Sequence, residues 1–198
     1  MEASPRDFTQ ETIGALIDEV GSEGLAPGAG SIAALTAALA AAVTESVALL
    51  SKEAAGDAEG AAKSAAELRE RLVLLANANA DAYTEATRSL AREAPDEAMR
   101  DARLGSDLAR AAYTPLQIAE VAAQVADFAA VLAKGATPEV RPDAVVAACL
   151  AEGAARGAAH LVRINLGMIP DDERIHRAAD FADAAAASRE KALGVSPR

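Results

Sequence analysis

The sequence predicts an all-α protein, a helical bundle of about six helices in a single domain spanning residues 1–198. Apolar residues recur every three or four positions over long stretches, as on one face of an amphipathic helix. No stretch alternates apolar and polar residues between turn signals, so we expect no sheet. Hydrophobic residues make up 52% of the chain and aromatic residues only 3%, because much of the apolar content is alanine. A thin alanine core needs closely packed helices, which favours a two-fold dimer.

Glycine and proline residues divide the chain into the expected helices. The first covers 8–20, where Phe8, Ile13 and Ile17 share one helical face. The others are predicted over 31–54, 57–93, 96–134, 143–168 and 171–193. Pro115 lies inside the segment 96–134. Since proline lacks a backbone N–H, we expect a kink there.

The strongest turn signal in the chain is the glycine- and proline-rich segment Ala26-Pro27-Gly28-Ala29-Gly30-Ser31, which is followed by a run of small residues. The glycines and the proline predict a sharp turn, and Ser31 is predicted to cap the next helix. The unpaired amides of that helix start would suit an anion, so residues 27–31 are candidate ligand-binding residues. The alternative is a tight connection between close-packed helices. Gly153 and Gly157, four residues apart, predict a second close approach between helices.

The formal net charge of −11 argues against nucleic acid and against anionic membrane surfaces as partners. The longest uncharged run, residues 25–44, is rich in alanine and glycine and too weakly hydrophobic to predict a membrane span. The polar N-terminus does not resemble a signal peptide. A lone cysteine, Cys149, has no disulfide partner in the chain and suits a reducing compartment. We therefore expect a soluble cytoplasmic protein.

Metal chemistry is not expected from this sequence. His160 and His176 are the only histidines, their spacing does not place them together on a helix face, and no metal-binding motif is present. A hydrogen-bonded or solvated histidine is the simpler interpretation for each.

Four segments, met in order along the chain, resemble one known family. They are Pro27-Gly28-Ala29-Gly30-Ser31-Ile32-Ala33-Ala34, Asn77-Ala78-Asn79-Ala80-Asp81-Ala82-Tyr83, Pro115-Leu116-Gln117-Ile118-Ala119-Glu120, and Pro142-Asp143-Ala144-Val145-Val146-Ala147-Ala148 leading on to Ile164-Asn165-Leu166. Together they resemble the cyclodeaminase/methenyltetrahydrofolate cyclohydrolase family, which includes the cyclodeaminase half of formiminotransferase-cyclodeaminase.

The resemblance implies a helical homodimer with a folate-binding cleft near the dimer interface. It implies hydrolysis of 5,10-methenyltetrahydrofolate or cyclisation of formiminotetrahydrofolate with loss of ammonia, with the tetrahydrofolate derivative as substrate and no separate cofactor. Both reactions need proton transfer and a negative charge near a cation, which a positioned carboxylate supplies. The implied catalytic residues are Asn77, Asn79 and Asp81, and the implied substrate-binding residues are Pro27, Gly28, Ala29, Gly30, Ser31, Asp143, His160 and Asn165.

The chain departs from the family where the chemistry is expected. The acidic pair of the mid-helix segment is replaced by Asn77 and Asn79, which lack the charge and basicity of carboxylates. Ala29 interrupts the family's glycine triplet, Pro142 replaces a serine, and His160 stands where an asparagine is common.

Three interpretations remain open at this point. In the first, Asp81, one turn after Asn77, supplies the carboxylate for acid–base catalysis, or another residue, Asp143 or His160, takes the acid–base role. Alternatively, the pocket acts on a different heterocycle or binds a folate-like ligand without catalysis. The third possibility is a dimeric interaction module, in which Asn77 and Asn79 only satisfy hydrogen bonds inside the bundle.

Overall fold

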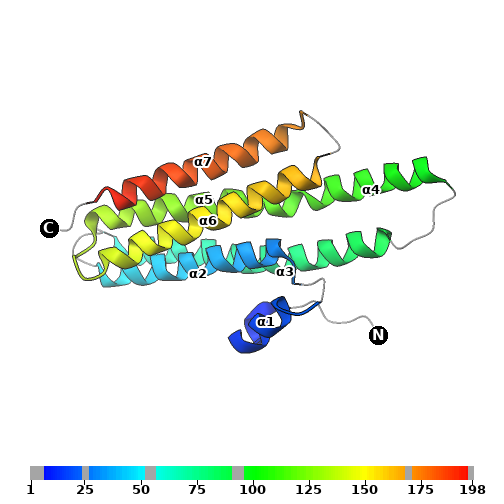
Figure 1. The fold of residues 1–198 in the computed structure, drawn as a ribbon. Helices are drawn as coiled ribbons and strands as arrows, with labels where there is room; N and C mark the ends of the chain where they lie inside the picture. Colours follow the sequence, from blue (N-terminus) through cyan, green and yellow to red (C-terminus); the bar gives the residue numbers. More distant parts are fainter. Residues whose placement is uncertain (1–6, 24–26, 52–56, 91–95, 168–170, 196–198) are drawn as a thin grey trace.

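In the computed structural model, residues 7–23, 27–51, 57–90, 96–167 and 171–195 are described. Within them the chain forms helices and no strand, which confirms the predicted all-α class (Figure 1). The elements are a short 3₁₀ helix η1 (Phe8–Gln10), α1 (Ile13–Val20), α2 (Ala29–Leu50), α3 (Ala58–Leu90), α4 (Glu97–Ala111), α5 (Tyr113–Gly135), α6 (Arg141–Asn165) and α7 (Glu173–Leu193). The predicted helix ends at 54, 93 and 168 lie outside the described residues.

Side-chain caps define the starts of several helices. Asp96 accepts a hydrogen bond from the backbone N–H of Met99 at 2.7 Å at the start of α4. Asp172 accepts one from Arg174 at 2.9 Å at the start of α7. Each carboxylate satisfies an amide that has no partner within its own helix, and its charge complements the helix dipole.

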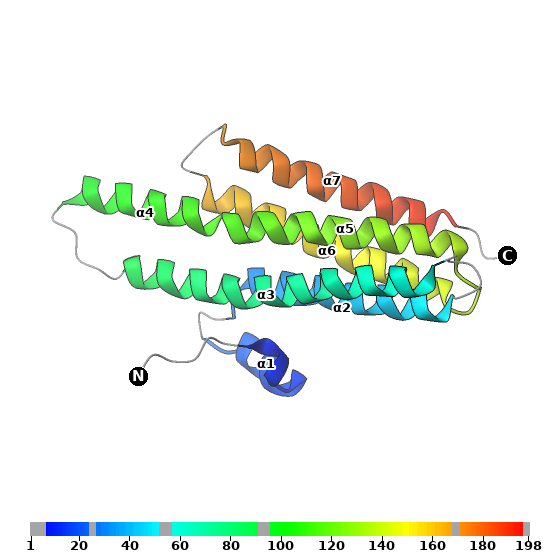
Figure 2. The same ribbon diagram turned by 180° about the vertical axis from the view of Figure 1, so that it is seen from behind.

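The expected long helix over 96–134 is broken into α4 and α5 at Ala112. Pro115 follows three residues later, and its ring would collide with the carbonyl of Ala111, four residues back, in a continuous helix. The helix is therefore interrupted near the proline, as expected, but α4 and α5 continue in nearly the same direction, without a pronounced bend (Figure 2).

The helices pack in two layers. α2 and α6 are antiparallel neighbours on the face seen in Figure 1, whereas α3 and α5 form the opposite face seen in Figure 2. α7 packs along α5 and α6 at one edge. At the other edge η1 contacts α3, and α1 is seen below α2 and α3 in both views.

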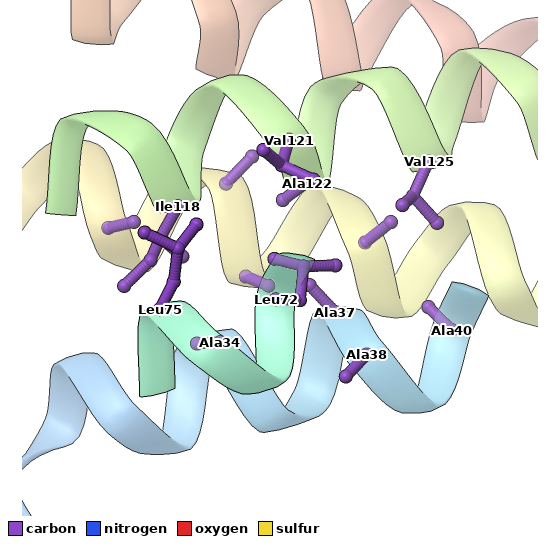
Figure 3. Close-up of a cluster of buried hydrophobic side chains, with 14 of the residues drawn as sticks. Ala34, Ala37, Ala38, Ala40, Leu72, Leu75, Ile118, Val121, Ala122 and Val125 are labelled. Carbon is purple, nitrogen blue, oxygen red and sulfur yellow. The ribbon is translucent and has the colours of Figure 1, made fainter. Parts of the chain in front are cut away.

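Alanine dominates the contacts between the layers. Figure 3 shows alanines of α2 facing Leu72 and Leu75 of α3 and Ile118, Val121 and Val125 of α5. Leu72 is fully buried. Because alanine side chains are short, α2 can approach its neighbours closely, and the few large side chains fill the remaining space.

The predicted apolar face over 8–20 is only partly correct. Phe8 is buried in η1, but α1 buries none of its residues, and the side chains of Ile13 and Ile17 are 76% and 63% exposed. The periodicity was typical of a core-facing helix, but within the described residues the apolar stripe of α1 meets little of the bundle.

Three segments are long and apolar enough, by length and composition alone, to cross a membrane. They are Ala29–Leu50, Glu97–Gly135 and Arg141–Asn165. The most apolar window of the second is 67% buried inside the protein, whereas those of the first and third are 44% and 39% buried. More than half of the most apolar window of α2 and of α6 is therefore not buried within the described part of one copy.

Candidate active site

Ser31 lies inside the first turn of α2 and does not cap it. Gly28 holds the cap position and has no side chain to donate or accept there. Ser31 is fully buried, and its hydroxyl donates to the backbone carbonyl of Ala76 in α3 at 2.9 Å. The predicted N-cap was wrong because the tertiary contact between α2 and α3 provides this hydroxyl with a partner.

Asn79 completes this contact. Its carboxamide Nδ2 donates to the Ser31 hydroxyl at 3.3 Å, and its side chain is buried. A Cβ atom on Gly30 would lie 2.5 Å from Oδ1 of Asn79. Gly30 is therefore required so that the Asn79 side chain can lie against the backbone of α2.

Asn77 has a different partner. Its Oδ1 accepts a hydrogen bond from the backbone N–H of Phe8 at 3.2 Å. The half-buried Asn77 thus ties the start of η1, with its buried Phe8 ring, to the middle of α3. Asn77 and Asn79 both make hydrogen bonds that hold segments of the fold together.

Asp81 lies one turn beyond Asn77 and lines a cavity of about 270 Å³ between α3, α4 and the start of α5. Glu85, Asp107, Arg110 and Thr114 contribute to its wall. Arg110 forms ion pairs with Glu85 at 3.2 Å and Asp107 at 3.3 Å. Among the described residues, no hydrogen bond or ion pair engages the Asp81 carboxylate.

Three carboxylates and one guanidinium line this cavity, so it carries a net negative formal charge. The volume is close to the lower end of small-ligand sites, which occupy roughly 300–1,000 Å³. The sequence interpretation included Asp81 but missed Asp107 and Arg110. The signal in the sequence was the spacing of Asp107 and Arg110: two opposite charges three residues apart on a predicted helix can form an ion pair.

The remaining candidates do not gather around this cavity. Pro27 is buried and Ala29 is exposed, both at the start of α2. His160 is exposed on α6 and accepts a hydrogen bond at Nδ1 from Arg163 at 3.1 Å. Asn165 is the half-buried last residue of α6.

Asp143 lies in the first turn of α6, at the opposite end of the bundle (Figure 1). At 1.5 Å per residue it is about 25 Å along α6 from His160. Asp143 does not line the cavity that Asp81 lines, so within one copy of the chain the two carboxylates do not share this site.

Nothing in the described part of the chain brings together three or more histidine, cysteine or acidic side chains that could hold a metal ion. The observations define an all-α bundle with an acidic cavity lined by α3 and α4 and the start of α5.

The sequence model of the formiminotransferase-cyclodeaminase family matches residues 12–184. The chain belongs to this family. Its fold is similar to the crystal structure of formiminotetrahydrofolate cyclodeaminase from Thermotoga maritima, with a TM-score of 0.83 and 19% sequence identity over 94% of this chain and 96% of that one. The comparison with curated protein sequences finds no match.

Proposed function

We propose that this protein is a folate one-carbon enzyme that hydrolyses 5,10-methenyltetrahydrofolate or cyclises formiminotetrahydrofolate with release of ammonia. Membership of the formiminotransferase-cyclodeaminase family and the fold shared with a formiminotetrahydrofolate cyclodeaminase support the substrate class. The observation that carries the proposal is the Asp81 carboxylate, which lines an acidic cavity and has no partner among the described residues.

The chemistry requires a negative charge and a proton acceptor next to a cation. In the hydrolysis, water adds to the methenyl carbon of the amidinium, the adduct loses a proton, and one C–N bond breaks to leave a formyl group. A carboxylate at Asp81 would stabilise the cation and accept that proton. In the cyclisation, the second folate nitrogen attacks the carbon of the protonated formimino group, the proton of the attacking nitrogen passes to the formimino nitrogen, and ammonia leaves, which forms the same cation.

Arg110 gives the cavity a second property. Its guanidinium pairs with Glu85 and Asp107 and so neutralises part of the acidic wall. The excess negative charge is left on the side of Asp81, where the cationic carbon would lie. We propose that Arg110 holds Asp107 in place and that Asp81 faces the substrate.

The first experiment follows the absorbance of 5,10-methenyltetrahydrofolate with and without the protein, in a buffer in which spontaneous hydrolysis is slow. A parallel assay measures ammonia release from formiminotetrahydrofolate. Acceleration of either reaction above background supports the proposal and distinguishes the hydrolase from the lyase. Background rates in both assays, with folded protein at micromolar concentration, would reject it.

A second candidate is a folate-binding protein without catalysis. The hydrogen bonds of Asn77 and Asn79 favour it, because both residues serve the fold and neither supplies a charge. In that case 5,10-methenyltetrahydrofolate would raise the melting temperature of the protein without being consumed.

We also propose that the protein acts as a homodimer, with the tetrahydrofolate derivative as its substrate and no resident metal or organic cofactor. The excess of apolar surface on α2 and α6 supports the dimer.

A further inference from the structure

Helix α4 packs against the bundle without burying any of its residues. It nevertheless forms one wall of the acidic cavity, through Asp107 and Arg110. Arg110 joins it to α3 by an ion pair with Glu85, and these two side chains are 65% and 67% exposed. Because ion pairs between exposed side chains contribute little to stability, this contact holds α4 only weakly. The position of the α4 wall therefore depends on how α4 is joined to α5.

The junction between α4 and α5 is itself interrupted. α4 ends at Ala111 and α5 begins at Tyr113, and Pro115 cannot donate the backbone hydrogen bond that a continuous helix would need there. Arg110 lines the cavity just before the break, and Thr114 lines it just after. A change of angle at the break would therefore move the α4 wall relative to the wall that α3 supplies.

Arg174, in the first turn of α7, contacts both sides of this break. Its Nη1 donates to the backbone carbonyl of Ala109 at 2.7 Å, before the break. Its guanidinium lies over the ring of Tyr113, 4.9 Å from the ring centroid, after the break. The last carbonyls of a helix lack partners within it and carry partial negative charge, so a cation suits Ala109.

Asp172 holds the Arg174 guanidinium in one orientation. Nε and Nη2 of Arg174 donate to the two oxygens of the Asp172 carboxylate at 2.9 and 2.7 Å, and both side chains are largely buried. This bidentate pair leaves Nη1 for Ala109 and a flat face for Tyr113. A lysine has one compact ammonium group and cannot make the three contacts together.

We propose that Arg174 is a positioning residue for the acidic cavity. It fixes the angle between α4 and α5, and so it sets where the wall that carries Asp107 and Arg110 lies. Arg174 does not itself line the cavity. This inference deepens the proposed function and rests on it for the substrate, 5,10-methenyltetrahydrofolate. Asp81 lies on α3, outside the segment that Arg174 holds, so the proposed catalytic carboxylate stays in place when the contact is lost.

The first measurement needs no substrate. Hydrogen exchange read by mass spectrometry compares the wild-type full chain with Arg174→Lys. Exchange over residues 97–114 is expected to rise about tenfold or more, the effect of losing one hydrogen bond to a charged group. Peptides of α3 around Asp81 should exchange as in the wild type, because the contacts of Arg174 lie on α4, α5 and α7.

Two further variants accompany this comparison. Tyr113→Leu removes the aromatic face and keeps the Asp172 pair, so it is expected to raise the same exchange less; it gives the same test if Arg174→Lys does not fold. Arg189→Lys is the matched control, because Arg189 lies about 22 Å further along α7 and pairs with Glu190 at 2.6 Å. Exchange over 97–114 should not change in this control.

The second measurement separates KM from kcat. With 5,10-methenyltetrahydrofolate, Arg174→Lys is expected to raise KM about fivefold or more and to change kcat by less than about twofold, since a binding wall moves and the catalytic carboxylate does not. Asp81→Asn has the opposite signature, because it lowers kcat. A merely structural loss would reduce the amount of folded enzyme and leave KM unchanged.

Wild-type exchange over 97–114 in both Arg174→Lys and Tyr113→Leu would overturn the proposal, whatever the activity. So would an equal rise in the Arg189 control, or an unchanged KM in an active Arg174 variant. Faster exchange in a protein that is inactive on both folate substrates would instead support the hold of Arg174 on the α4 wall and reject the proposed reaction.

Discussion

The Nδ2 atom of Asn79 donates a hydrogen bond to the Ser31 hydroxyl at 3.3 Å, and that hydroxyl donates its own proton to the carbonyl of Ala76. The Ser31 hydroxyl thus accepts from one group and donates to another, both in α3. An amide suits this position because it can donate, which an ionised carboxylate cannot. The Asn77 side chain accepts from the backbone N–H of Phe8 and also donates a hydrogen bond to the Asp7 carboxylate, which helps to lower the pKa of Asp7. An aspartate would therefore have different consequences at Asn79 and at Asn77.

Asn79→Asp is expected to destabilise the protein by about 1–3 kcal/mol at pH 7, because it buries a charge and turns the Ser31 proton away from Ala76. Asn77→Asp should cost less: the new carboxylate loses the hydrogen bond to the Asp7 carboxylate and repels it, but both groups are near solvent and the N–H of Phe8 keeps an acceptor. Urea unfolding of both variants at pH 7 provides the comparison. Equal losses in the two variants would show that the direction of the Asn79 hydrogen bond has no consequence.

Gly30→Ala is expected to cost about 1–3 kcal/mol of stability, because the new methyl group would lie 2.5 Å from Oδ1 of Asn79 and force a shift. In the Asn79→Ala background the same change should cost clearly less, since the obstructing side chain is gone. Gly105→Ala is the control, at a helical glycine with open space, and should stabilise slightly. Additive losses at Gly30 and Asn79 in thermal unfolding would contradict the proposed contact.

Asp81→Asn is expected to lower kcat/KM for the folate substrate by at least about 100-fold, within the range of lost acid–base catalysis, and to leave the melting temperature nearly unchanged. The reason is that the carboxylate is exposed and holds no described partner, so its removal costs the fold little. Asp180→Asn, at an exposed position on α7, removes the same charge far from the cavity. Full activity in the Asp81 variant would exclude this residue as the catalytic carboxylate.

The side chain and backbone N–H of Arg174 both donate to Asp172 and lower the pKa of its carboxyl to about 2. Because this folded-state pKa lies below the ordinary value of 3.8, the ionised form stabilises the protein above about pH 4. That stabilisation is lost as the pH falls from 4 toward 2. Arg174 also donates to the carbonyl of Ala109 at 2.7 Å, which joins the start of α7 to α4.

Asp172→Asn is therefore expected to lower the melting temperature at pH 7 and to flatten the fall in stability between pH 4 and pH 2. Asp171→Asn removes the same charge one residue earlier and leaves the Arg174 contact in place; asparagine also tolerates the positive φ of 70° at this position. Differential scanning calorimetry at pH 2, 3, 4 and 7 separates the two variants. Parallel pH profiles for wild type and the Asp172 variant would contradict the assignment.

The sequence by itself determined the helices. The repeat of apolar residues, together with the glycine and proline residues between the repeats, predicted the helical segments. Pro115 predicted the break that separates α4 from α5. These features were predictable because the backbone hydrogen bonds of a helix form within one segment, so its own residues decide where it begins and ends. The alanine-rich composition likewise predicted the close packing seen around Leu72.

Only the tertiary structure decided which partner each polar side chain has. The local sequence predicted that Ser31 caps a helix, but in the fold its hydroxyl donates to the Ala76 carbonyl of α3. Asn77 and Asn79 have different partners, Phe8 and Ser31. The structure also placed Asp81 in one cavity wall with Asp107 and Arg110. A Cβ atom on Gly153 or Gly157 would meet nothing within 4 Å among the described atoms, so the close approach predicted at these glycines is not made within the described part of one copy. Such contacts join residues far apart along the chain, so they depend on how the helices turn and pack against one another, which the period of a single segment does not specify.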